Sequence, residues 1–199
     1  MAREEESTGR SWKTSRLDAL RSEINSCRLC GLCNGRTNAV AGEGPEDARI
    51  FLLGEAPGAE EDRTGRPFVG RAGRILEDCL SSAGLERGQV FITNTVKCRP
   101  AKNRPPSSEE VKLCRKYLDA QLGIVKPSVI VTLGRVPLGL FIRSKRLGRE
   151  PFRWDGYMVV PAYHPAAALH GIPNVRSSLT ESLKLARSLS ENGSSAITE

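Results

Sequence analysis

Four cysteines have a spacing that suits a metal centre. Cys27 and Cys30 form a C-x2-C pair, while Cys98 and Cys114 follow far along the chain as C-x15-C. A close pair and two distant thiolates can together surround a compact ion or cluster. Because a zinc ribbon has two close pairs and this chain has one, the spacing favours an iron–sulfur cluster over zinc.

The two other cysteines differ in their surroundings. With six cysteines and no export signal, metal ligands or buried thiols are expected rather than disulfides. Cys33 extends the first pair and could replace one of its ligands. Cys79 falls on the apolar face of a predicted helix and is expected to be a core thiol. Six inert buried thiols would be the plainer alternative, but they would leave the tight N-terminal spacing unexplained.

A second group of reactive side chains lies in GEAPGAEEDRTGRPFVGRAG, residues 54–73. This stretch has five glycines, four carboxylates and one aromatic residue, Phe68, and it follows directly on the apolar run 50–53. So much glycine predicts a loop rather than a helix or a strand. Its acidic residues and its lone ring therefore stand just beyond a strand, where α/β folds bind ligands.

Strand and helix patterns alternate along the chain. Four short apolar runs predict buried strands, at residues 49–53, 90–96, 128–133 and 158–162. Helical periodicity is found at residues 17–24, 72–80, 107–122 and 177–188. Ser107 and Glu110 form a capping box at the start of the third helix, and Gly84 is a natural end for the second.

This alternation predicts an α/β fold, a three-layer α/β/α sandwich with a short, mostly parallel central sheet. We expect one domain over residues 14–189, between disordered tails at 1–13 and 190–199. Four loops directly follow strands, with the sequences GEAPG, TNTVK, TLGRV and AYHPA. They should meet at one rim of the sheet, which is where a site is expected.

The charge balance suits an anionic partner. The 199-residue chain has a formal net charge of +7, and cationic side chains displace counterions from a phosphate backbone. Many basic proteins bind no nucleic acid, so charge alone leaves that partner open. With 39% hydrophobic residues and no long apolar run, the chain is expected to be soluble and intracellular, without a membrane span.

The sequence resembles the family 4 uracil-DNA glycosylases, the iron–sulfur branch of their superfamily. The resemblance rests on residues 54–73, on ITNTVKCRP followed by NRPP, on HPAAAL and on the spacing of the four cysteines. It covers the chain from about Leu17 to Leu189. It implies a base-excision repair enzyme that rotates uracil, the product of cytosine deamination, out of single- or double-stranded DNA and hydrolyses its N-glycosidic bond.

The resemblance also implies a cofactor and a setting. Cys27, Cys30, Cys98 and Cys114 would hold a 4Fe–4S cluster that does no redox chemistry in the reaction. We expect it to pin the N-terminal segment onto the rest of the domain and to place basic residues near DNA. The protein is expected to be a monomer in the cytoplasm or in another compartment that holds DNA.

Two residues would recognise the base. Phe68 would stack on the extruded uracil, although the same ring could simply anchor its loop in the core. Asn94 has one acceptor and two donors on a planar amide, so it can pair with N3–H and O4 of uracil, whereas cytosine presents the reverse polarity. An asparagine at a strand end is otherwise often a turn or capping residue.

Two further residues would help the base to leave the stack and the sugar. His164, before Pro165, would donate a hydrogen bond to uracil O2 as negative charge develops on the departing base. Leu169 would be the apolar wedge that props open the vacated stack, with a buried helix position as the alternative. His170 would contact at most a phosphate.

The carboxylates of the glycine-rich stretch would have separate roles. Glu55 would orient the attacking water and offset positive charge on the sugar. Glu61 would line the C5 edge of the base, where the methyl group of thymine would collide. The backbones of Ala56 and Pro57 would line the base pocket. Other branches of the superfamily resemble GQDPY, with aspartate where this chain has Ala56, so the sequence leaves the activator of the water open.

The other charged residues near the rim are expected at the surface. Glu60 and Asp62 are predicted to be solvated loop charges. Several arginines are candidates for phosphate contacts, namely Arg63, Arg66, Arg71, Arg99, Arg104 and Arg135. Two alternatives remain: a non-catalytic, metal-stapled module that binds nucleic acid, and a glycosylase of the same superfamily with a broader range of damaged bases.

Overall fold

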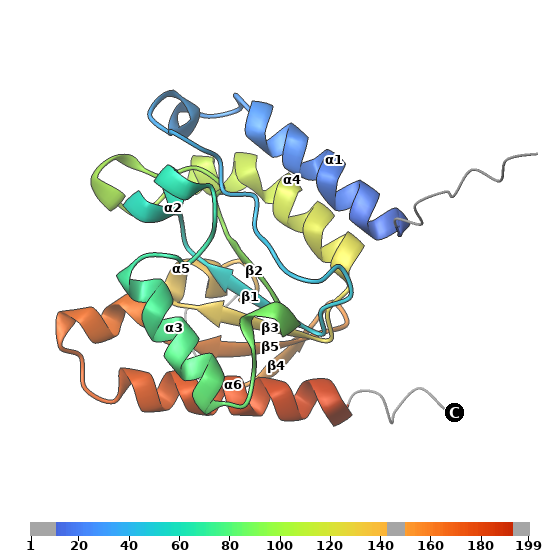
Figure 1. Ribbon diagram of the computed structural model, residues 1–199, viewed down its shortest axis with the longest axis vertical. Helices are drawn as coiled ribbons and strands as arrows, with labels where there is room; N and C mark the ends of the chain where they lie inside the picture. The colour runs from blue at the N-terminus through green and yellow to red at the C-terminus, as the bar shows by residue number, and fades with distance from the viewer. Residues whose placement is uncertain (1–10, 143–149, 193–199) are drawn as a thin grey trace, which may run out of the picture.

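A five-stranded sheet runs through the middle of the protein (Figure 1). The computed structural model describes residues 11–142 and 150–192. The strands are Ile50–Gly54 (β1), Val90–Asn94 (β2), Val129–Leu133 (β3), Phe152–Trp154 (β4) and Tyr157–Ala162 (β5). Their order across the sheet is β2-β1-β3-β5-β4, and every pair is parallel except β4 with β5.

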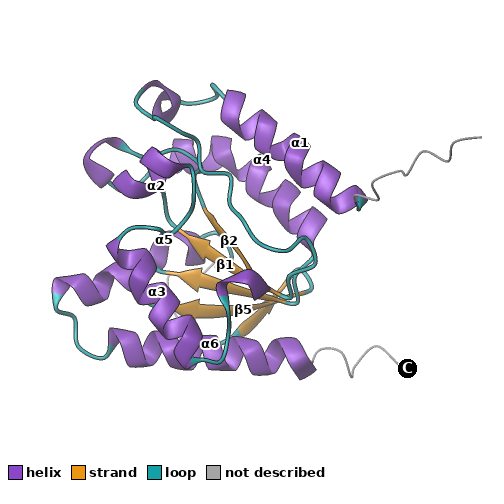
Figure 2. Ribbon diagram, in the orientation of Figure 1, coloured by secondary structure: helices purple, strands orange, loops and turns teal. Residues whose placement is uncertain are grey.

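Helices surround this sheet (Figure 2). The α-helices are Trp12–Ser26 (α1), Ala59–Thr64 (α2), Arg71–Ser82 (α3), Ser108–Val125 (α4), Arg135–Leu138 (α5) and Val175–Asn192 (α6). The 3₁₀ helices are Gly31–Asn34 (η1), Arg87–Gln89 (η2), Ala101–Asn103 (η3) and Pro165–His170 (η4). Among the described residues, no helix combines the length and the apolar character that a membrane crossing requires.

The strands build two cores because successive side chains point to opposite faces of a sheet. In β1, Ile50 and Leu52 pack in the core under α3 and α6. Phe51 and Leu53 pack in the core under α4 and α5. Helix α1 lies outside these layers and packs along α4 (Figure 1). The structure thus confirms the three-layer α/β/α sandwich with its mostly parallel sheet.

The predicted elements are present with shifted ends. All four predicted strands are found, and the capping box of α4 is confirmed, since Ser107 Oγ accepts from the Glu110 N–H at 3.2 Å and the Glu110 carboxylate accepts from the Ser107 N–H at 2.7 Å. Strand β4 was not predicted. It joins β5 through a two-residue turn at Asp155 and Gly156, which have φ angles of +46° and +84°, as a tight hairpin turn requires.

Two expectations about boundaries were wrong. The glycine-rich stretch is not all loop, because α2 lies inside it, between Gly58 at its start and Gly65 at its left-handed end. The predicted tails were also drawn too long, since α1 begins at Trp12 and α6 ends at Asn192. The rest of both predicted tails, residues 1–10 and 193–199, lies outside the described residues.

Candidate active site

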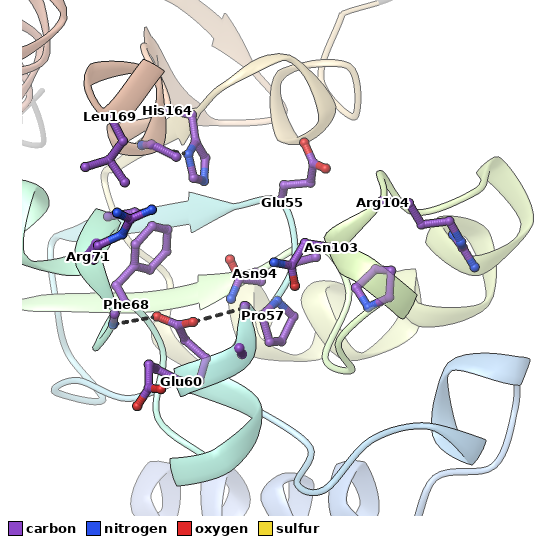
Figure 3. A pocket seen from close by; sticks show the side chains of 18 residues that line it. Glu55, Pro57, Glu60, Phe68, Arg71, Asn94, Asn103, Arg104, His164 and Leu169 are labelled. Carbon is purple, nitrogen blue, oxygen red and sulfur yellow. Dashed lines mark hydrogen bonds between the residues drawn. The ribbon is translucent and has the colours of Figure 1, made fainter. Parts of the chain in front are cut away.

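A cavity of about 530 Å³ opens at the carboxyl ends of the strands. Eight residues that the sequence singled out line it: Glu55, Ala56, Pro57, Glu61, Phe68, Asn94, His164 and Leu169. They come from the end of β2 and from the segments that follow β1 and β5. Figure 3 shows six of them, Glu55, Pro57, Phe68, Asn94, His164 and Leu169, around one common space. The loop after β3 packs closely against one of them, because a Cβ on its Gly134 would lie only 3.2 Å from the Cβ of His164.

The carboxylate of Glu61 ties the two halves of the glycine-rich stretch together. Its Oε2 accepts from the Gly58 N–H at 3.0 Å, and its Oε1 accepts from the N–H groups of Val69 and Gly70, both at 2.9 Å. The side chain is buried, at 9% exposure. Hydrogen bonds to a buried carboxylate are stronger than those between neutral groups. Glu61 therefore lines the cavity and fixes its wall at the same time.

Phe68 is held in a backbone conformation that large side chains rarely adopt. Its φ angle is +49°, in the left-handed region. The turn packs so closely that a Cβ on Gly73 would lie 2.0 Å from the Phe68 carbonyl oxygen. A Cβ on Gly54 would lie 2.6 Å from the ring. Glycine at both positions lets the ring reach the cavity wall, where it lies 5.9 Å from the His164 ring, centroid to centroid.

Asn94, the last residue of β2, lines the cavity and has an unsatisfied side-chain oxygen. Within the described residues, its Oδ1 is buried and has no hydrogen-bond partner. The whole residue is only 1% exposed. Leaving a buried acceptor unpaired costs about 1–3 kcal/mol. A ligand that donates an N–H group in the plane of this amide would recover that cost.

Lys97 supports Asn94 from inside the protein, and nothing in the sequence pointed to it. Its Nζ is fully buried and donates to Thr93 Oγ1, the Asn94 carbonyl oxygen and Gln121 Oε1, at 2.7, 2.8 and 2.7 Å. Burial lowers the pKa of Lys97 to about 8. The Gln121 amide in turn donates to the Ala41 carbonyl oxygen. The end of β2 is thus fixed to α4 and to the segment before β1.

His164 faces the cavity as a neutral ring with a defined proton. Burial lowers its pKa to about 4. Its Nδ1 accepts from the Ala166 N–H at 3.1 Å, so that the side chain caps η4. An Nδ1 that accepts carries no proton, and the proton of the neutral ring must then be on Nε2. His164 can therefore donate one hydrogen bond from Nε2 without carrying charge.

Glu55 follows β1 directly and is the half-buried carboxylate of the site. Burial raises the pKa of its carboxyl above the ordinary value. Among the described residues, no hydrogen bond to its carboxylate is found. Its backbone is fixed, since its carbonyl oxygen accepts from the Val96 N–H at 3.2 Å. A desolvated carboxylate with free oxygens can bind a water or stand beside a developing positive charge.

The rim of the cavity combines an apolar residue with cations. Leu169 on η4 is 40% exposed at the edge. Arg71 and Arg104 also line the cavity, together with Asn103, which the sequence analysis missed. Three of the candidate arginines, Arg63, Arg66 and Arg104, form ion pairs with acidic neighbours.

Glu60 and Asp62 were both predicted to be solvated charges, which is wrong for Asp62 and right for Glu60. Asp62 was predicted to be a solvated charge, but it is only 5% exposed, and both its oxygens accept from the Thr37 N–H, at 2.9 and 3.1 Å. It ties α2 to the segment that follows the first cysteines. Glu60 is exposed and pairs with Arg63 on the same helix.

Five cysteines line one small apolar pocket away from the cavity: Cys27, Cys30, Cys33, Cys98 and Cys114. Burial raises the pKa of the Cys30, Cys98 and Cys114 thiols. Arg36 donates to Cys98 Sγ at 3.0 Å. In the described ranges, no three histidine, cysteine or acidic side chains are placed to hold a single metal ion. Cys79 is buried in the core under α3 and α6, as predicted.

The sequence is similar to those of known proteins. Residues 41–183 match the family model of the uracil DNA glycosylase superfamily. The chain belongs to this superfamily. A type-4 uracil-DNA glycosylase from Sulfurisphaera tokodaii is 46% identical over 187 residues, which cover 87% of this chain and 84% of that protein. A second type-4 uracil-DNA glycosylase, from Thermotoga maritima, is 41% identical over 179 residues, or 86% of this chain and 93% of that protein.

Within the superfamily, the similarity to another group is weaker. A type-5 uracil-DNA glycosylase from Thermus thermophilus is 32% identical over 188 residues, covering 77% of this chain and 85% of that protein. The chain is thus placed with the type-4 group, as the sequence motifs predicted. The part that matches the superfamily model begins after Cys27 and Cys30 and includes every loop of the cavity.

The Glu61 hydrogen bonds predict a loss of stability on a small change. In Glu61→Gln, one of the two accepting oxygens becomes an NH₂ group that faces a backbone N–H. We expect the free energy of unfolding to fall by about 1–3 kcal/mol, measured by denaturant unfolding. Glu60→Gln, on the exposed side of α2, is the matched control and should change it by less than about 0.5 kcal/mol. Equal effects of the two changes would contradict the structure.

The state of His164 predicts a titration. Its ring nitrogens, observed by NMR in a His170→Gln background that removes the only other histidine, should show the neutral Nε2–H form down to about pH 4. Unfolded histidine binds its proton at about pH 6.5. The folded protein therefore binds fewer protons between these two values, and its stability should fall as the pH drops through this window. Protonation of His164 near pH 6.5 in the folded protein would refute the assignment.

Proposed function

We propose that the protein is a uracil-DNA glycosylase, which hydrolyses the N-glycosidic bond between uracil and deoxyribose in DNA. One observation carries this proposal: among the described residues, the buried Oδ1 of Asn94 lacks a partner, and Asn94 lines the same cavity as the rings of Phe68 and His164. Uracil can donate its N3–H to Oδ1 and accept at O4 from the Asn94 NH₂. Cytosine has a bare N3 and an amino group at C4, so its polarity is reversed.

The ring of Phe68 supports the same orientation. It lines the cavity next to Asn94, where it can stack on the face of a base that the amide binds at its edge. Stacking on an aromatic side chain is worth about 1–3 kcal/mol per base. That is comparable to the few kcal/mol needed to unstack a nucleotide from the duplex.

His164 supplies the stabilisation of the leaving group. As the bond from C1′ to N1 breaks, its electron pair moves onto the uracil ring and O2 gains negative charge. A neutral imidazole can donate from Nε2 to this oxygen without a proton transfer. One preorganised donor of this kind contributes about 10²–10³-fold to the rate.

Glu55 serves the sugar side of the bond. Its carboxylate stands beside the positive charge that develops on the deoxyribose and orients a water toward C1′. The oxygen of that water forms the new bond to C1′ as the bond to N1 breaks. The water loses one proton to the solvent, and the uracil anion takes up a proton from the solvent at N1. Because Glu55 is partly desolvated, its charge acts through a medium that screens less than water.

Glu61 restricts which pyrimidine fits. Its carboxylate lines the cavity and is fixed by three backbone N–H groups, so it cannot swing aside for a larger base. We assign it to the C5 edge, where it excludes the methyl group of thymine. The backbones of Ala56 and Pro57 complete the wall.

DNA reaches the cavity over its rim. Leu169 is placed to fill the gap that the rotated nucleotide leaves in the stack. Arg71 and Arg104 at the edge can contact phosphates. The names of the type-4 relatives agree with a DNA substrate of this kind. Removal of uracil that arises from cytosine deamination is the corresponding repair function.

The cysteine pocket fits a 4Fe–4S cluster held by Cys27, Cys30, Cys98 and Cys114. In a cluster each thiolate binds a different iron, so the sulfurs lie farther apart than around a single ion. The apolar lining excludes water, and Arg36 can offset thiolate charge on Cys98. When bound, the cluster supplies a covalent link between the segment after α1, the end of the β2 loop and α4.

A panel of lesions tests the enzymatic proposal. Wild type should release uracil from oligonucleotides, detected as strand cleavage after alkali, and should leave thymine and cytosine intact. His164→Ala should lower the rate by about 10²–10³-fold, and Glu55→Gln by about 10²–10⁴-fold, both with DNA affinity retained. His170→Ala and Glu60→Gln are the matched controls and should stay close to wild type.

The same panel separates the alternatives. DNA binding without cleavage of any uracil substrate would indicate that the protein is a non-catalytic module that binds nucleic acid. Release of hypoxanthine or another damaged base at a similar rate would indicate the broader substrate range.

A 4Fe–4S cluster would colour the protein, and removing one of its ligands should remove that colour. Protein purified without oxygen should be brown, with about four iron atoms per chain. Cys114→Ser should lose iron and colour, whereas Cys79→Ser, in the core, should keep both. A colourless wild type that contains zinc, or iron retained in full by Cys114→Ser, would rule out this ligand set.

A further inference from the structure

Arg87 does not line the cavity, but it holds the residue whose ring does. Its Nη1 donates to the Phe68 carbonyl oxygen at 3.3 Å, and its Nη2 donates to the Pro67 carbonyl oxygen at 2.5 Å. The N–H groups that follow, on Val69 and Gly70, are bound by Glu61. The peptide after Phe68 is therefore held at its oxygen by a cation and at its N–H by an anion.

The turn needs this support because of its backbone. Phe68 has a φ angle of +49°, and a bulky residue in this region is strained by about 1–3 kcal/mol. Such a conformation persists only where the surroundings determine it. Without the guanidinium, two carbonyl groups of the turn lose their donor, and Phe68 is free to relax toward a negative φ. Its ring would then leave the plane in which it meets the base.

Arg87 is itself fixed by Glu43, which pairs with β2, the strand that ends in Asn94. The side chain is 18% exposed, and its Nε and Nη2 donate to Glu43 Oε1 at 2.9 and 2.8 Å. The backbone of Glu43 pairs with Ile92 of β2 through two hydrogen bonds, at 3.0 and 2.7 Å. Two glycines permit this approach, because a Cβ on Gly42 would lie 2.8 Å from the Ile92 carbonyl oxygen and one on Gly44 2.3 Å from that of Val90.

These contacts form one chain from β2 through Glu43 and Arg87 to the Phe68 turn. Strand β2 also ends in Asn94. The Phe68 ring and the Asn94 amide are thus both held in position by one strand, β2. We propose that Arg87 is a positioning residue that aligns the Phe68 ring with the Asn94 amide for base binding. The proposal rests on the proposed function, since the alignment matters only if a base enters the cavity.

The chain offers a matched control. Arg66 also pairs with Glu43, with its Nε and Nη2 at 2.9 and 3.0 Å from the carboxylate oxygens, but no hydrogen bond to the Phe68 turn is found for it among the described residues. Its side chain is 61% exposed. Arg66→Met therefore removes a partner of Glu43 and leaves the donors to the turn in place.

The test compares Arg87→Met, Arg87→Lys and Arg66→Met in the iron-loaded protein. The measurements are the single-turnover rate of uracil release and the inhibition constant of free uracil. Arg87→Met should slow release by roughly 10- to 100-fold and weaken inhibition by free uracil. Arg87→Lys keeps the charge beside Glu43 but not the fork that reaches both carbonyls, so it should show most of the same loss. Arg66→Met should leave the inhibition constant of free uracil, which has no phosphate for a surface arginine to contact, within about twofold of wild type.

A double-mutant cycle with Phe68→Ala distinguishes positioning from general stability. If Arg87 acts through the ring, Arg87→Met should cost at most about twofold more once the ring is gone. An undiminished further loss in the Phe68→Ala background would overturn the proposal, and so would wild-type rates in both Arg87 variants. If Arg87→Met does not fold, the same cycle is run with Arg87→Lys. Failure of wild type to release uracil would instead refute the proposed function.

Discussion

The strained turn at Phe68 is held by a buried carboxylate and a partly buried guanidinium, and the cavity depends on it. Glu61 binds the N–H groups after the turn and Arg87 binds its carbonyl oxygens. Glycines at 54 and 73 allow the close packing that results. Since the Pro67 and Phe68 carbonyl oxygens and the Val69 and Gly70 N–H groups all have partners, the turn that carries the ring is fixed on both sides of Phe68. A flat surface beside the Asn94 amide is therefore ready before any base arrives.

The two groups that we propose to bind the base carry no charge. Asn94 is neutral, and burial keeps the His164 ring neutral at physiological pH. The charged side chains of the wall are mostly committed to other groups: Glu61 to three amides and Arg104 to Glu110. Of the three described carboxylates that line the cavity, Glu60 pairs with Arg63 and Glu61 binds the amides, while no hydrogen bond or ion pair to the Glu55 carboxylate is found. Such a cavity suits a neutral base whose negative charge appears only as its bond to the sugar breaks.

The sequence predicted the elements whose signals lie within a few residues of each other. It did not predict the roles of side chains whose partners lie in distant segments of the chain. Apolar runs located the strands, and Ser107 with Glu110 located the start of α4, because both signals lie within a few residues. The Asp155–Gly156 turn was a local signal too, and it was overlooked because β4 is only three residues long. Asp62 looked like a surface charge because its partner, the Thr37 N–H, is 25 residues away. The roles of Lys97 and Arg87 likewise depend on partners that only the folded chain brings near.

The orientation of uracil in the cavity is the central claim of the proposed mechanism. The most direct measurement is a crystal structure of the protein with free uracil bound. We predict the base lying flat on the Phe68 ring, with N3–H donating to Asn94 Oδ1 and O2 accepting from His164 Nε2. Uracil bound elsewhere, or bound in the cavity with the Asn94 amide turned away from its N3 edge, would contradict the account.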